Sequence, residues 1–186
     1  NVVYLESTGT DNKYLWLVTA IAGHEIDAFE QVWFNDQKVW ENGNFTSAWA
    51  TQGDSTTSPY IALSFHLGNQ TTADSGLNAA STKWTDNHKL LGTAYMVVKL
   101  TYDQEKFAQG LPNISTVIRG KKVYDAQKDS TSPYYESSLG VSTQRENNSA
   151  TWQWSQNPAL CIRDYLVDVK YGLGESVDNI LRSSID

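Results

Sequence analysis

Two segments with a strand-like pattern constrain the fold most. In PYIALSFHLG, residues 59–68, large apolar side chains occupy every second position from Ile61 to Leu67. Successive side chains of a strand point to opposite faces, so this spacing predicts a strand with one apolar face. GTAYMVVKLTYD, residues 92–103, is a second apolar segment of strand length. The seven Trp and ten Tyr also favour pleated, half-buried surfaces. We therefore expect a mainly β chain.

The remaining strand patterns lie between polar, turn-rich segments. NDQ is predicted to join Gln31–Phe34 and Lys38–Trp40 as a hairpin. Whether the strands close as a barrel or pack as a sandwich stays open. The predicted strands are Tyr14–Ala22, Phe29–Phe34, Tyr60–Leu67, Ala94–Tyr102 and Ile114–Ile118.

The clearest helix pattern is NPALCIRDYLVDVKYGLG, residues 157–174. Asn157 suits the N-cap, and Pro158 suits the first helical position, where its missing N–H costs nothing. Gly172 and Gly174 are expected to end this helix. A further helix is predicted to begin at Ser176. The expected fold is α+β, mainly β, with a strand-rich body, long polar loops and a C-terminal helix.

These patterns divide the chain into three parts. Residues 1–125 are predicted to form a β-rich domain, and residues 126–156 a long polar loop. Residues 157–186 are predicted to form a helical segment that continues into a longer protein. Loops as long as the middle part are usually functional or mobile.

Charge is distributed unevenly along the chain. The net charge is -7, and residues 1–80 hold two basic and nine acidic residues, which argues against binding of nucleic-acid phosphates there. By contrast, NISTVIRGKKVYD, residues 113–125, is predicted to form a hairpin with Gly120 in its turn. Its basic tip, Arg119, Lys121 and Lys122, is a candidate contact with an acidic neighbouring subunit. A solvated turn is the competing interpretation, and three charges are too few for specific nucleic-acid binding.

No motif predicts catalysis, a metal site or a cofactor. HEIDA, residues 24–28, has Ala28 where a zinc-protease helix needs its second His. An acidic pair could serve glycoside hydrolysis, but sequence does not show the separation of two carboxylates. We therefore expect no enzyme activity, no cofactor and no metal.

Other features bear on environment and binding. The single Cys161 excludes an internal disulfide and is interpreted as a small buried side chain. No segment resembles a signal peptide or a membrane span. Trp152 and Trp154 would share one side of a strand, so a carbohydrate-binding module with surface Trp residues is the alternative function. Burial of these rings in a core or interface is the favoured interpretation.

Four segments together resemble a known family. They are YLWLVTAIAGHEIDAFEQVWFND (14–36), KWTDNHKLLGTAYMVVKLTYD (83–103), GLPNISTVIRGKKVYD (110–125) and WSQNPALCIRDYLVDVKYGLG (154–174). In this order they resemble the central tail-tip proteins of phages with long, non-contractile tails, also called tip attachment, tail hub or host-specificity proteins. The passage between VYD and the last segment is longer here than in the family pattern.

The resemblance implies a structural role in the virion. Such proteins form a ring, usually trimeric, that closes the distal end of the tail tube, contacts the distal tail and tape-measure proteins, and opens for DNA. The chain would be an internal fragment of the N-terminal hub region, assembled in the bacterial cytoplasm and located at the tail tip of a phage or prophage. Neither a membrane anchor nor specific nucleic-acid binding is expected of it, and the family supplies no catalytic residues here.

Overall fold

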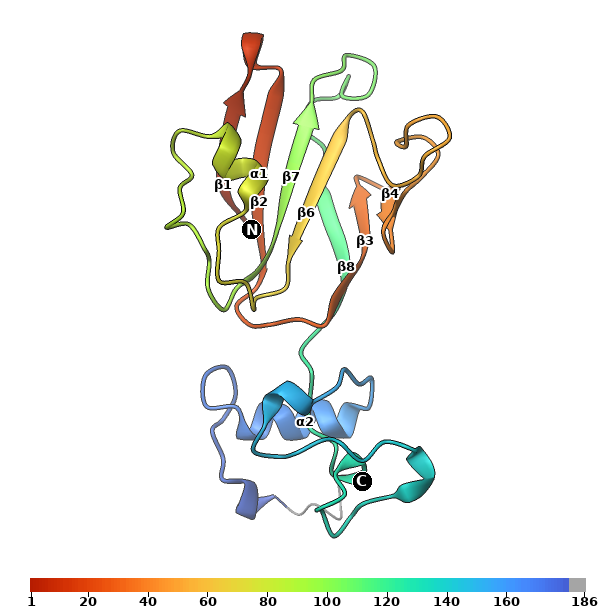
Figure 1. The fold of residues 1–186 in the computed structure, drawn as a ribbon, viewed down its shortest axis with the longest axis vertical. Coiled ribbons are helices and arrows are strands. Elements are labelled where there is room, and N and C mark those ends of the chain that lie inside the picture. Colours follow the sequence, from red (N-terminus) through yellow and green to blue (C-terminus); the bar gives the residue numbers. More distant parts are fainter. Residues whose placement is uncertain (181–186) are drawn as a thin grey trace. The chain divides into compact units, whose positions relative to one another are not determined.

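The computed structural model describes residues 1–180. The chain divides into two compact units, Asn1–Gly120 and Lys121–Asp186 (Figure 1). The first unit therefore ends before the boundary predicted at residue 125.

The first unit contains two four-stranded antiparallel sheets, which confirms the mainly β fold class. Sheet A has the order β1-β2-β7-β6, and sheet B has the order β5-β4-β3-β8. In sheet A the strands are β1 (Val2–Thr8), β2 (Tyr14–Ala22), β7 (Ala94–Thr101) and β6 (Ile61–His66). In sheet B they are β5 (Asn44–Phe45), β4 (Gln37–Glu41), β3 (Ala28–Phe34) and β8 (Ile114–Arg119). The five predicted strands all form, and the predicted hairpin is the β3–β4 pair.

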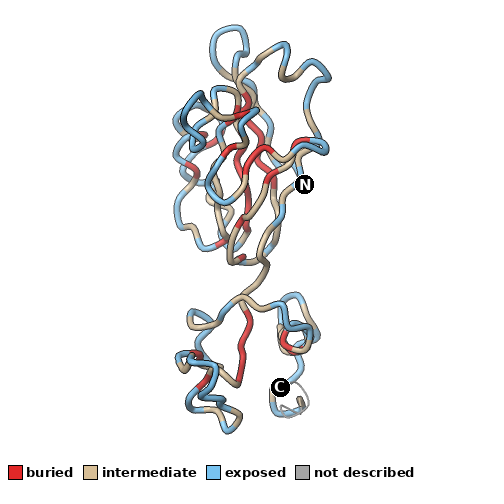
Figure 2. Tube along the Cα trace, turned by 90° about the vertical axis from the view of Figure 1, so that its right-hand side faces the viewer, coloured by how far each residue is buried: buried red, intermediate tan, exposed pale blue. Residues whose placement is uncertain are grey.

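The main core lies between the two sheets. Side chains of β2, β6 and β7 pack across this layer against those of β3, β4 and β8. Phe65 of β6 contacts Phe29 of β3 and Trp40 of β4 at ring-centroid distances of 4.8 and 4.5 Å. Buried residues follow the strands, whereas the connecting loops are mostly exposed (Figure 2). The two sheets remain separate, which decides between the sandwich and the barrel in favour of two packed layers.

A second, smaller core covers the outer face of sheet A. The connection between β6 and β7 carries the short helix α1 (Ser75–Ala80), which lies over this face (Figure 1). Leu77 and Trp84 from the connection pack on Trp16 and Val18 of β2 and on β7. Strand β7 is therefore buried on both faces, which explains the apolar run at residues 94–98.

The second unit is built around helix α2 (Pro158–Val167) and irregular segments. Asn157 caps α2 as predicted, since its Oδ1 accepts a hydrogen bond from the Ala159 N–H at 2.9 Å. The helix ends at Val167, earlier than the predicted glycines. The predicted polar loop, 126–156, holds three short 3-10 helices: Ala126–Lys128, Ser137–Leu139 and Ser149–Thr151. Another covers Val177–Asn179, and the rest of the predicted final helix, 181–186, lies outside the described residues.

Candidate functional site

The basic segment predicted as a hairpin tip does not form a hairpin. Strand β8 pairs with β3, and no strand returns from residues 121–125. Gly120 does not adopt a positive φ, so it makes no left-handed turn there. Ile118 packs in the core of the first unit, whereas Val123 is buried in the second unit and bridges to Gln153. Because the apolar residues on either side of the basic segment join different cores, the chain passes between units instead of turning back.

Arg119 and Lys121 each have an acidic partner within their own unit. Arg119 Nε lies 2.8 Å from Asp27 Oδ2 in the first unit. In the second unit, Lys121 Nζ lies 2.8 Å from Asp164 Oδ2 and 2.5 Å from Asp168 Oδ2. A contact between the segment 119–122 and another subunit stays a prediction, and these intrachain ion pairs compete with it.

The Lys121 cluster fixes the end of α2. The ammonium group of Lys121 and the backbone N–H groups of Tyr171 and Lys170 together lower the pKa of Asp168 to about 2. The charged carboxylate accepts both backbone hydrogen bonds at 2.8 Å and so holds the turn that follows the helix. Reversing the charge of Lys121 would leave two carboxylates without their cation, so such a variant reports on the stability of the second unit as well as on assembly.

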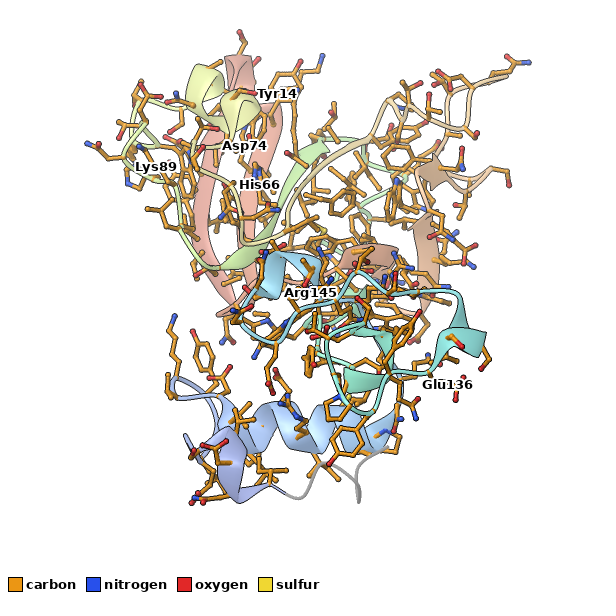
Figure 3. All side chains as sticks on the ribbon, turned by 60° about the horizontal axis from the view of Figure 1, so that its bottom comes forward. Tyr14, His66, Asp74, Lys89, Glu136 and Arg145 are labelled. Carbon is orange, nitrogen blue, oxygen red and sulfur yellow. The ribbon has the colours of Figure 1, made fainter. Side chains whose placement is uncertain are left out.

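The second unit also contains a larger network of polar side chains. Arg145 Nη1 lies 3.1 Å from Asp129 Oδ1, and the Tyr124 hydroxyl donates to Asp129 Oδ2 at 3.0 Å. The nearly buried Arg163 pairs with Glu146. A cavity of about 560 Å³ is lined in part by Tyr124, Asp129, Glu146 and Arg145, the last of which is labelled in Figure 3. Because the charges of these groups are paired with one another, no ligand is needed to explain their burial. The network therefore does not by itself indicate a binding site.

Helix α2 exposes a large part of its apolar surface. Leu160 and Arg163 form its buried side, and Cys161 is exposed, which corrects the interpretation of this cysteine as buried. Leu173 N–H donates to the Tyr165 carbonyl, so the chain after the helix returns to the helix end. This creates one surface, the α2 patch, whose members are exposed by 54 to 88%: Ile162, Tyr165, Val169 and Leu173.

A further exposed apolar surface lies at the edge of sheet A. Strand β1 pairs only with β2, so its other edge is open. Val2, Val3 and Leu5 on this strand are each more than half exposed. Open edges and apolar patches of this kind are typical of surfaces that other chains contact.

Ser64, His66 and Asp74 form a cluster of the residue types found in catalytic triads. Figure 3 shows His66 of β6 beside Asp74, which precedes α1. His66 Nε2 lies 2.9 Å from Asp74 Oδ2 and 3.3 Å from Ser64 Oγ. A catalytic triad needs the serine and the carboxylate on different ring nitrogens, so this arrangement does not make Ser64 a nucleophile.

The same cluster has a clear structural role. Asp74 Oδ1 accepts a hydrogen bond from the Leu77 N–H at 2.7 Å and so caps α1. Burial acts to raise the pKa of Asp74, but the hydrogen bonds from His66, Ser64 and Leu77 outweigh it and lower that pKa to about 2. The sequence around Asp74 is sufficient to predict this helix cap. No pattern in the sequence predicts that His66 pairs with Asp74.

The described residues offer little support for the other site types considered. Residues 1–180 contain no group of three or more His, Cys, Asp or Glu side chains placed to hold a metal ion. In the same range, neither helix has the length and apolar character needed to cross a membrane. All seven Trp residues are buried or half-buried, and a sugar module based on surface Trp residues stays a prediction: Trp16, Trp33, Trp40, Trp49, Trp84, Trp152 and Trp154.

Comparison with known proteins leaves the family open. No protein-family model matches the chain, and no curated protein sequence matches it.

Proposed function

We propose that the chain is a structural component of a phage or prophage tail tip. It forms part of the hub ring that closes the distal tail and supports host attachment and DNA passage. The four segments that resemble tail-tip proteins, in the family's order, carry this proposal. The partners are further copies of the protein, in a trimeric ring, together with the distal tail and tape-measure proteins.

The α2 patch supports this role. Free monomers rarely expose contiguous apolar patches larger than a few hundred Å². Here Ile162, Tyr165, Val169 and Leu173 are all more than half exposed within one helix end and its following turn. A subunit whose patch is covered by neighbouring parts of a tail tip has a physical reason to keep these side chains apolar.

Immunogold electron microscopy tests the proposed location. Antibodies raised against this chain are applied to purified phage particles from the source strain, with antibodies against the major tail-tube protein as control. The proposal expects gold at the distal end of the tail and control label along its length. Label on the head, label along the tube or no label on intact particles would overturn the tail-tip assignment.

Light scattering tests whether this part of the chain contributes to the ring. We expect a trimer whose mass falls when Tyr165→Ser introduces a polar group into the α2 patch. Leu91→Ser is the matched control, because Leu91 is 66% exposed on a loop of the first unit. A monomer at every concentration, at low and high salt, would contradict a ring contact in this part of the chain, while the microscopy independently decides the location.

A further inference from the structure

A small pocket opens at one end of the first unit. It has a volume of about 220 Å³ and lies between the turn that joins β3 to β4 and the segment that follows β7. Three aromatic rings, Phe34, Trp49 and Phe107, contribute to its wall. Trp49 connects the other two, with ring centroids 5.5 Å from Phe34 and 5.9 Å from Phe107. The pocket is therefore walled by a packed aromatic cluster.

Planar polar side chains line the same pocket. Gln37, Glu105 and Gln109 belong to its lining and are exposed residues. Amide and carboxylate groups can each bond two neighbouring hydroxyls, with the amide offering both donors and an acceptor. Phe34 and Trp49 are only 3% and 5% exposed, so the half-buried Phe107 supplies the aromatic face that can accept a flat apolar surface. One accessible aromatic ring with a polar rim thus fits a ligand ring that is apolar on its face and carries hydroxyls around its edge.

The walls of the pocket are held in place before any ligand binds. The Asn35 N–H donates to the Asn113 carbonyl at 2.7 Å, and the Asn113 N–H donates to Asn35 Oδ1 at 3.0 Å. Asp103 Oδ1 accepts the backbone N–H groups of Glu105 and Lys106 at 3.0 and 2.9 Å. Such anchoring reduces the ordering cost of binding.

The charges around the pocket favour a neutral ligand. Lys106 Nζ donates to the Ala48 carbonyl at 2.9 Å and lies over the rings of Trp49 and Tyr60 at 5.4 and 5.2 Å. Its cation is thus already engaged, and Glu105 adds an opposite charge nearby. The volume is smaller than the roughly 300–1,000 Å³ of pockets for larger ligands, so it suits a single ring.

We propose that this pocket binds one neutral pyranose unit of a saccharide. The inference rests on the first unit alone and goes beyond the tail-tip role. The pocket belongs to the first unit, whereas Trp152 and Trp154 belong to the second.

Two-dimensional NMR of the full chain tests the proposal. The probes are glucose, galactose and N-acetylglucosamine at millimolar concentrations, with the open-chain polyol sorbitol as a control. The expected result is a saturable shift of the Gln37 and Gln109 side-chain amides and of the Trp49 indole N–H for at least one sugar. Sorbitol, which has hydroxyls but no ring, is expected to cause no such shift.

Substitutions of residues that line the pocket test whether the sugar binds there. Gln37→Ala and Gln109→Ala are expected to weaken sugar binding by about tenfold each, because each removes hydrogen bonds to the ligand. Gln104→Ala is the matched control, since Gln104 is exposed on the same segment but does not line the pocket. Absence of shifts with all three sugars, or equal binding in all three variants, would overturn the proposal. So would saturable shifts at these groups with a tetraproline peptide and not with sugars, since the pocket would then be a peptide site.

Discussion

At the scale of single residues, Asp74 links helix α1 to strand β6 of sheet A. Its carboxylate accepts one hydrogen bond from the start of α1 and another from His66 on β6. The His66 ring also stacks on Tyr95 at a centroid distance of 4.2 Å. Burial and the Asp74 charge raise the pKa of Tyr95 to about 12, so its hydroxyl stays protonated.

The lowered pKa of Asp74 predicts that the free energy of unfolding depends on pH. Its pKa is about 2 in the folded chain and 3.8 as a free side chain, so the unfolded state binds more protons between these values. The stabilisation is therefore fully present only well above pH 3.8, and it is lost as the pH falls through 3.8 towards 2. Allowing for solvent screening, we expect Asp74→Asn to cost about 1–2 kcal/mol at pH 7. Asn retains the capping oxygen, so the change isolates the charge.

Urea unfolding at pH 7 and at pH 3 measures this effect. The difference between the wild type and Asp74→Asn should shrink at the lower pH, because the wild-type carboxylate then loses its advantage. Asp36→Asn is the control, since Asp36 is exposed in the β3–β4 turn. An equal difference at both pH values would show that the Asp74 charge does not stabilise the fold.

At the scale of elements, α1 and its flanking loops act as a cover for sheet A. The side chain that anchors the cover is Leu77, which is fully buried among Trp16, Val18 and Tyr95. Without Leu77, apolar groups on the outer face of β2 and β7 would be exposed to solvent. Stability of the cover therefore depends on packing more than on the six-residue helix itself.

Leu77→Ala should destabilise the first unit by about 3 kcal/mol, because it removes buried methyl groups and leaves a cavity. Thermal and urea unfolding followed by Trp fluorescence measure the loss. Leu91→Ala, at a site that is 66% exposed, should change the free energy of unfolding by less than about 0.5 kcal/mol. Similar losses in both variants would refute the anchoring role of Leu77.

Helix α2 shows where an element could be predicted and where it could not. Its N-cap follows from Asn157 and Pro158, which act through local backbone hydrogen bonds. Its buried side does not follow from the apolar pattern, because the charged Arg163 is buried while the apolar Ile162 is exposed. The choice depends on Glu146, which is 17 residues away and pairs with Arg163.

At the scale of the whole molecule, the chain consists of two units that each hold their own buried residues. Both apolar clusters of the described residues lie entirely before Gly120. We expect residues 1–120 alone to keep a β-type circular dichroism spectrum and to unfold in one cooperative transition, since their core needs no side chain from the second unit. A truncated chain without a cooperative transition would show that the second unit is required for folding.

The sequence by itself determined the strand-rich fold, the β3–β4 hairpin and the start of α2. These features depend on alternation, turn residues and capping, all of which act between residues close together in the chain. Only the tertiary structure decided that the basic segment 119–122 joins two units instead of forming a hairpin tip. Lys121 binds carboxylates 43 and 47 residues away, and the aromatic pocket combines Phe34, Trp49 and Phe107. Such contacts arise from the packing of distant segments, which no local pattern encodes.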